Sequence, residues 1–87
     1  MLTAEMQYII RNFNAGSVAT VDADGRPKVS PKATFLILDD ATIAFANIRS
    51  PGTIANLRFN PNLEVCFTDI LARKAVRVSG MGEVVLI

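Results

Sequence analysis

The segment from Asn47 to Asn56 combines residue types that bind anions in proteins. Ser50 and Thr53 place two hydroxyl groups at the start of an expected helix, where unpaired backbone N–H groups and the helix dipole attract negative charge. Gly52 has no side chain that would obstruct a phosphate group, and Arg49 adds a cation beside it. These groups could bind a phosphate. The residues alone favour the alternative, that Ser50 only caps the helix and Arg49 is a solvated charge, because Ser-Pro caps are common.

Two groups of basic residues offer further positive charge. Lys28 and Lys32 flank a strand and the start of the next one, and Arg73, Lys74 and Arg77 form the densest basic cluster of the chain. Each group could hold an anion, the second one in the same chain or across a dimer. The alternatives are edge-strand lysines, which discourage aggregation, and a solvated loop between strands.

Other reactive residue types are scarce. The chain has one cysteine, Cys66, and no histidine, which excludes an intrachain disulfide, a histidine-based catalytic triad and a zinc site that uses histidine. Cys66 lies in an alternating strand, and we interpret it as a small, half-buried residue; no metal site is expected. The single cysteine indicates a reducing, cytoplasmic setting. Redox or transfer chemistry would therefore depend on a cofactor.

The composition predicts a single folded domain over residues 1–87. Of these residues 51% are hydrophobic and 20% are charged, which excludes a disordered chain. Nine Lys and Arg against eight Asp and Glu give a net charge of +1, so the sequence carries no signature of nucleic-acid or membrane-surface binding. No apolar run approaches the roughly 20 residues of a membrane span. We therefore expect no nucleic-acid partner and no membrane.

Two helices are expected among the elements that must position these residues. Met6, Ile9, Ile10 and Phe13 fall on one helical face, and Thr3 can cap the start of that helix. A second helix of about two turns is expected to begin at residue 51, where proline suits the first helical position, and to end before the Asn-Pro step at 60–61.

Most of the chain is predicted to be short strands, six or seven in number. They are expected at residues 17–21, 27–30, 34–38, 42–47, 63–68, 76–79 and 83–87. The Asp-Gly step at 24–25 predicts a hairpin turn, and the uninterrupted apolar run 34–38 predicts a strand that is covered on both faces. Short strands joined by turns indicate an antiparallel barrel or sandwich. The last strand is apolar, so we expect a partner chain or a further C-terminal segment to cover it.

The order of these segments resembles the pyridoxamine 5'-phosphate oxidase-like flavoproteins, which are FMN-binding split-barrel proteins. The resemblance rests on the runs PKVSPKATFLILDD, TIAFANIRSPGTIANLRFNPNLEVCFTD and RKAVRVSG, and it covers nearly the whole chain. It implies a mostly β fold, namely a six-stranded antiparallel split β-barrel with an N-terminal helix and one short helix between strands. It also implies a homodimer with FMN at the dimer interface, and a chain without the C-terminal helix and strand of longer relatives.

The resemblance assigns residues to three parts of a cofactor site. It implies that five consecutive residues line the flavin: Ser30, Pro31, Lys32, Ala33 and Thr34. It implies that four residues surround the phosphate and the ribityl chain: Asn47, Ser50, Thr53 and Asn56. It implies that three residues of the neighbouring strand or of a partner subunit contact the cofactor: Arg73, Lys74 and Arg77.

This chain departs from the family pattern at the start of the second helix. Many relatives place a Lys or Arg two or three residues after the helix-start serine, where this chain has the run 51–53 without a cation. The phosphate charge would then be met by Arg49, by Lys32 or by the basic cluster at 73–77.

The resemblance implies an FMN-dependent oxidoreductase that exchanges electrons with a small-molecule substrate or electron donor. One alternative is a non-catalytic module for flavin binding, storage or electron transfer. Another is a degenerate structural dimerisation domain. Relatives with the same fold also hold deazaflavin or haem, because a fold does not fix a function.

Overall fold

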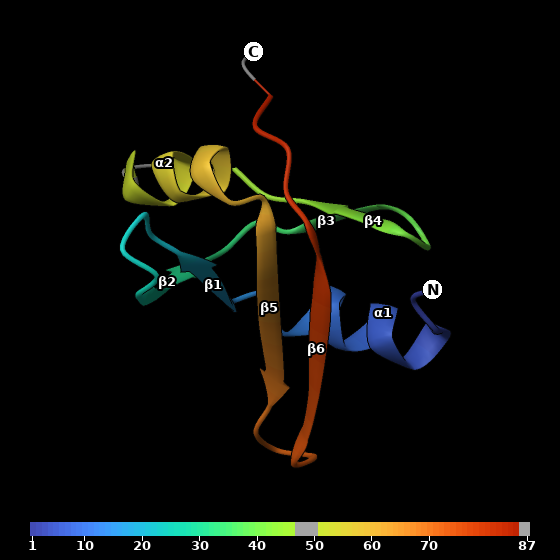
Figure 1. Ribbon diagram of the computed structural model, residues 1–87. Coiled ribbons are helices and arrows are strands. Elements are labelled where there is room, and N and C mark those ends of the chain that lie inside the picture. The colour runs from blue at the N-terminus through green and yellow to red at the C-terminus, as the bar shows by residue number, and fades with distance from the viewer. Residues whose placement is uncertain (47–50, 86–87) are drawn as a thin grey trace.

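The computed structural model describes residues 1–46 and 51–85, which form two helices and six strands (Figure 1). The elements follow one another as α1 (Ala4–Asn12), β1 (Gly16–Val21), β2 (Pro27–Lys32), β3 (Leu36–Asp39), β4 (Thr42–Ala44), α2 (Pro51–Phe59), β5 (Asn62–Asp69) and β6 (Lys74–Met81). All strand pairs are antiparallel, so the prediction of a mostly β fold is confirmed. Neither helix is long and apolar enough to cross a membrane.

Helix α1 begins with a capping box, as its sequence predicts. The hydroxyl of Thr3 accepts the backbone N–H of Met6 at 3.2 Å, and the Met6 sulfur accepts the backbone N–H of Thr3 at 3.4 Å. Ile9 and Ile10 are buried, and the helix packs against β5 and β6. Burial of such side chains stabilises the fold by about 1.5–3 kcal/mol each.

The larger sheet has the strand order β2-β1-β5-β6. Its first hairpin turns at residues 22–25, where Asp22 Oδ1 accepts the backbone N–H groups of Asp24 and Arg26, both at 2.9 Å, and Gly25 adopts a φ of +80°. This turn fixes the register, because Val21 then pairs with Pro27. Strand β2 runs further than the predicted 27–30, since it is an edge strand and tolerates a second proline.

One face of the larger sheet carries the core. Val18, Val65 and Phe67 are almost fully buried there, and the ring of Phe35 contacts Phe67 edge-on at 4.7 Å between centroids. Helix α1 and the β3–β4 hairpin pass behind β5 and β6 in Figure 1. The side chains of these strands that point away from this core are mostly exposed.

The opposite face of the larger sheet is open to solvent within this chain. Ser17, Cys66 and Arg77 lie on it, and all are exposed. The prediction of a half-buried Cys66 is therefore wrong, because the strand alternates as expected but its outer face has no cover.

Strands β3 and β4 form a two-stranded sheet of their own. Leu36 and Leu38 are exposed, so the prediction of a strand covered on both faces is wrong: only the side that carries Phe35 and Ile37 packs on the core. Among the described residues no strand pair joins the two sheets, and they do not close into one barrel.

The predicted last strand is also absent from residues 83–85. Strand β6 pairs only with β5, and that pairing ends where Met81 meets Asn62, the first residue of β5. Beyond this point the backbone finds no neighbouring strand, and Gly82 instead donates its N–H to the Pro61 carbonyl at 2.7 Å.

Candidate functional site

A cavity of about 420 Å³ lies between the β1–β2 hairpin and the start of α2. All its described lining residues except one glycine carry a polar side chain, and they come from β1, the hairpin turn, β2 and α2. The lining residues are Thr20, Asp22, Lys28, Ser30, Gly52, Thr53 and Asn56.

The strand side of the cavity follows from the register of the hairpin. Thr20 pairs with Lys28, and Val18 pairs with Ser30. Because side chains alternate along a strand, Lys28 and Ser30 lie on the same face as the buried residues of β1. That face continues from the apolar core into the cavity, where the residues become polar.

The helix side is held by one hydrogen bond between residues far apart in the sequence. Asn56 Nδ2 donates to Thr20 Oγ1 at 3.1 Å, and Thr20 is buried. This bond links α2 to β1. A β-carbon added at Gly52 would meet no atom within 4 Å, so the first turn of α2 leaves open space at this position.

Thr53 is the buried polar residue that lacks a partner in the cavity. It is 7% exposed, and within residues 1–46 and 51–85 its hydroxyl makes no hydrogen bond. A buried polar group without a partner costs about 1–3 kcal/mol. The hydroxyl therefore offers a bond that a ligand oxygen could complete.

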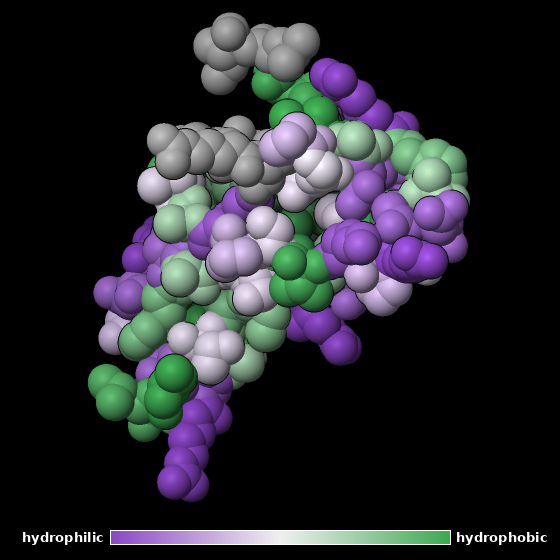
Figure 2. Space-filling model, turned by 90° about the vertical axis from the view of Figure 1, so that its left-hand side faces the viewer, coloured by the Kyte–Doolittle hydropathy of each residue, from purple (hydrophilic) through white to green (hydrophobic). Residues whose placement is uncertain are grey.

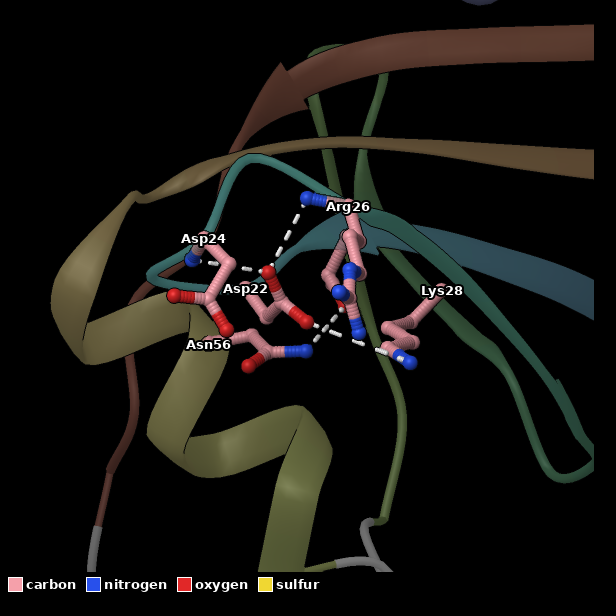
Figure 3. A network of polar contacts seen from close by, with 6 residues as sticks. Asp22, Asp24, Arg26, Lys28 and Asn56 are labelled. Carbon is pink, nitrogen blue, oxygen red and sulfur yellow. Dashed lines mark hydrogen bonds and ion pairs between the residues drawn. The ribbon is translucent and has the colours of Figure 1, made fainter.

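Among the described residues, one acid and one base line the cavity, Asp22 and Lys28, and both are labelled in Figure 3. Asp22 Oδ2 lies 3.9 Å from Lys28 Nζ, and the two side chains are 22% and 56% exposed. Figure 3 shows Asn56 on α2 facing the hairpin that carries both of them. The cavity thus contains an ion pair whose length is near the 4 Å limit for such a contact. Hydroxyl and amide groups, which are uncharged hydrogen-bond donors, lie beside it.

The structure brings together three of the residues that the sequence assigns to the cofactor: Ser30, Thr53 and Asn56. The cavity adds Thr20, Asp22, Lys28 and Gly52. Sequence reasoning singled out Lys28 and Gly52 without assigning them, and it missed Thr20 and Asp22. Their signal was the hairpin turn, which fixes the pairing of the two strands.

The other predicted flavin-lining residues do not line this cavity. Pro31 is exposed on the edge strand, and Lys32 is buried on the core face. Ala33 and Thr34 form the exposed link to β3, and Thr34 has a φ of 60°, which is unusual for a β-branched residue. Asn47, Arg49 and Ser50 lie outside the described residues.

The basic cluster at 73–77 lies away from the cavity. Lys74 donates to Glu5 Oε1 at 2.7 Å, and this hydrogen bond together with the opposite charge lowers the pKa of Glu5 and raises the pKa of Lys74. Arg77 lies on the open face, with its Nε 3.8 Å from Glu64 Oε1. Arg73 is in the β5–β6 turn, with a φ of 55°. None of the three lines the cavity of its own chain.

Comparison with known proteins gives one family and several related structures. The family model described as pyridoxamine 5'-phosphate oxidase matches residues 2–86. HupZ of Group A Streptococcus is 33% identical, with a TM-score of 0.85, over 93% of this chain and 64% of that one. A Lactobacillus delbrueckii protein assigned to the pyridoxamine 5'-phosphate oxidases is 29% identical, with a TM-score of 0.83, over 90% of this chain and 64% of that one.

A more distant structure shares the fold alone. HutZ, the haem storage protein of Vibrio cholerae, is 23% identical, with a TM-score of 0.70, over 92% of this chain and 60% of that one. The chain therefore spans less than two thirds of the length of these three proteins. No match is found among curated proteins.

Proposed function

The chain belongs to the pyridoxamine 5'-phosphate oxidase family, and from this premise we propose that it binds FMN, with the phosphate and the adjoining ribityl chain in the cavity between β1, β2 and α2. The observation that carries the proposal is the hydroxyl of Thr53, a buried residue of that cavity, which has no hydrogen-bond partner among the described residues. A phosphate or ribityl oxygen is the kind of ligand atom that would accept or donate a hydrogen bond there.

The cavity also supplies the other groups that phosphate binding needs. Lys28 provides a cation, and the first turn of α2 provides backbone N–H groups, which attract anions. Ser30 adds a second hydroxyl. Lys28 thereby takes the place of the cation that many relatives carry just after the helix-start serine.

When bound, the flavin would supply the electron transfer, and the protein would bind and orient it. We therefore propose an oxidoreductase that exchanges electrons with a small-molecule donor or substrate. This chain's residues hold the phosphate end. The same polar cavity serves equally well in a protein that stores or carries FMN, so reduction of the bound flavin must be measured separately.

A homodimer is part of the proposal. Arg73, Lys74 and Arg77 cannot reach the cavity of their own chain, so they would contact the cofactor only from a second copy. Ile70 and Leu71 are exposed at the tip of the β5–β6 hairpin, and Figure 2 shows hydrophobic atoms protruding at the lower left, just above the hydrophilic atoms at the lowest point. We infer that a second copy covers such surfaces, and that the two sheets are the halves of a split barrel.

Haem is the other cofactor to be tested, because one relative by fold is a haem storage protein. The 87 residues contain no histidine, and the only thiol, that of Cys66, is exposed on the open face and does not line the cavity. The hydroxyl, amide and ammonium groups that line the cavity favour FMN.

The experiment is a titration of the protein with FMN and with riboflavin, followed by flavin fluorescence and absorbance, with the particle mass measured in parallel. We expect FMN to bind more tightly than riboflavin, to a particle of two chains. Lys28→Gln should weaken FMN about tenfold, since a charged hydrogen bond is worth about 1.5–3 kcal/mol, and should leave riboflavin unchanged. Arg26→Gln is the matched control, because Arg26 is an exposed cation of the same hairpin that does not line the cavity.

Each outcome separates one part of the proposal. FMN that stays free in the presence of the wild-type protein overturns it, and so does a Lys28→Gln variant that weakens both ligands equally. Bound flavin that no nicotinamide donor reduces favours storage over catalysis. Stoichiometric binding of haemin in place of FMN would show that haem, and not FMN, is the cofactor of this chain.

A further inference from the structure

We propose that Asp22 is a built-in counter-anion, which competes with the ligand phosphate for Lys28 and so determines how strongly the cavity prefers a phosphorylated ligand. This inference rests on the proposed function. Of the described residues that line the cavity, Asp22 alone is acidic. A carboxylate inside an anion site opposes the ligand, and its presence there requires an explanation.

The two oxygens of Asp22 have different roles. Oδ1 accepts the backbone N–H groups of Asp24 and Arg26 and thereby builds the hairpin turn. Oδ2 makes no bond to the turn and lies 3.9 Å from Lys28 Nζ. The turn therefore needs the Oδ1 acceptor of this residue but does not need its negative charge.

The charge acts on the ligand in two ways. In the free protein it pairs with Lys28, so an incoming phosphate must separate the lysine from its carboxylate. In the complex the same carboxylate stays near the phosphate and repels it. Both effects apply to FMN, which carries a phosphate, and neither applies to riboflavin, which is uncharged.

The effect is moderate because the pair is partly solvated. The distance is at the outer limit of an ion pair, and Lys28 is 56% exposed, so water screens the attraction. Asp22 itself is only 22% exposed and cannot turn away without breaking the hairpin turn. It therefore lowers the affinity for phosphate at all times but does not block the site.

The test is Asp22→Asn, which keeps an oxygen for the turn and removes the charge. We expect FMN to bind about two- to fivefold more tightly, the factor that corresponds to a partly exposed charge pair, with riboflavin unchanged. Asp24→Asn is the matched control, because Asp24 is exposed on the same turn and does not line the cavity. It should change the affinity for FMN much less.

A double-mutant cycle then assigns the effect to Lys28. If Asp22 acts partly by pairing with the lysine, its replacement should gain less in the Lys28→Gln background than in the wild type. Asp22→Ser offers a second neutral acceptor for the turn, and thermal melts show whether either variant disturbs the fold.

The outcomes distinguish this inference from the proposed function. Wild-type protein that does not bind FMN overturns both. Wild-type protein that binds FMN through Lys28, together with a folded Asp22→Asn variant of unchanged affinity, overturns the inference alone. An equal gain in Asp24→Asn also overturns it, because the effect would then be one of net charge.

Discussion

Replacing Thr53 by valine should stabilise the free protein and weaken its hold on FMN. Valine has nearly the shape of threonine and removes only the hydroxyl, which is buried without a partner among the described residues. An unpaired buried hydroxyl costs about 1–3 kcal/mol; water that enters the open cavity recovers part of this. We expect the free energy of unfolding to rise by up to about 1 kcal/mol, or the melting temperature by about 4–8 °C per kcal/mol in a domain of this size.

The same substitution should act in the opposite direction on the complex. If the hydroxyl bonds to the phosphate or to the ribityl chain, its loss removes about 0.5–1.5 kcal/mol of binding, which is about two- to tenfold in affinity. Stability and affinity therefore change in opposite directions, and this sign does not depend on the exact magnitudes.

Thr20→Val is the matched control, in the same cavity and with the same change of atoms. Thr20 is 4% exposed, but its oxygen accepts the Asn56 amide. Its replacement leaves that donor unpaired, so it should destabilise the protein by about 1–2 kcal/mol. Both variants can be compared with the wild type by thermal melts without ligand and by FMN titration. A Thr53→Val variant that melts at a lower temperature would refute the reasoning, since the hydroxyl would then have a partner in the fold.

Three further predictions concern the framework of the site. Gly16→Ala should destabilise the protein by about 1–3 kcal/mol, because the added carbon would lie 2.7 Å from the ring of Phe35 and 2.9 Å from the ring of Phe67. In the same denaturant titration Gly80→Ala should be tolerated, because its added carbon would meet no atom within 4 Å. Asn14→Ala should cost about 1–3 kcal/mol, because its amide pairs both the N–H and the carbonyl of the backbone before β3, and aspartate should not restore the stability, since it cannot donate to that carbonyl. Glu5→Gln removes the ion pair with Lys74. Because the pKa of Glu5 is lowered from 4.5, the ion pair stabilises the fold above that pH and is lost as the pH falls through the lowered pKa. The difference in melting temperature between wild type and variant should therefore shrink from about pH 6 to about pH 3.

Local signals in the sequence predicted the elements well. The capping residue Thr3 and the face formed by Ile9 and Ile10 are where the spacing placed them, and the Asp-Gly turn begins β2 at residue 27, as expected. Each of these features is decided within about ten residues, where capping and turn chemistry act. The type and order of the elements could therefore be predicted from the sequence.

Burial could not be predicted in the same way, because it depends on what packs on each face. The run at 34–38 is apolar throughout, yet Leu36 and Leu38 are exposed, since a single chain covers one side of β3 only. Cys66 lies between the buried residues Val65 and Phe67 in the sequence, as the alternation predicts, and it is exposed because nothing in this chain covers its face of the sheet. The sequence specifies which residues share a face, whereas the neighbouring layer decides whether that face is buried.

The cavity shows a similar division between local and distant signals. The turn at 22–25 places Thr20 opposite Lys28, and this pairing was open to prediction from the sequence. The side of the hairpin on which α2 lies was not, because it depends on the bond from Asn56 to Thr20 across 36 positions. The sequence therefore did not point to Asp22 as a residue of the cavity, because its place there depends on where α2 lies.

The candidate site divides into a part that one chain builds and a part that it does not. The described residues around Lys28 and Thr53 line the cavity from one chain, whereas the cluster at 73–77 does not line it. If a second copy supplies that cluster, dilution to single chains should remove its contribution but leave that of the cavity. The ratio of FMN to riboflavin affinity, which the cavity determines, should then persist in the monomer while both affinities fall together. A ratio that collapses on dilution would instead place the phosphate-binding charge on the partner subunit.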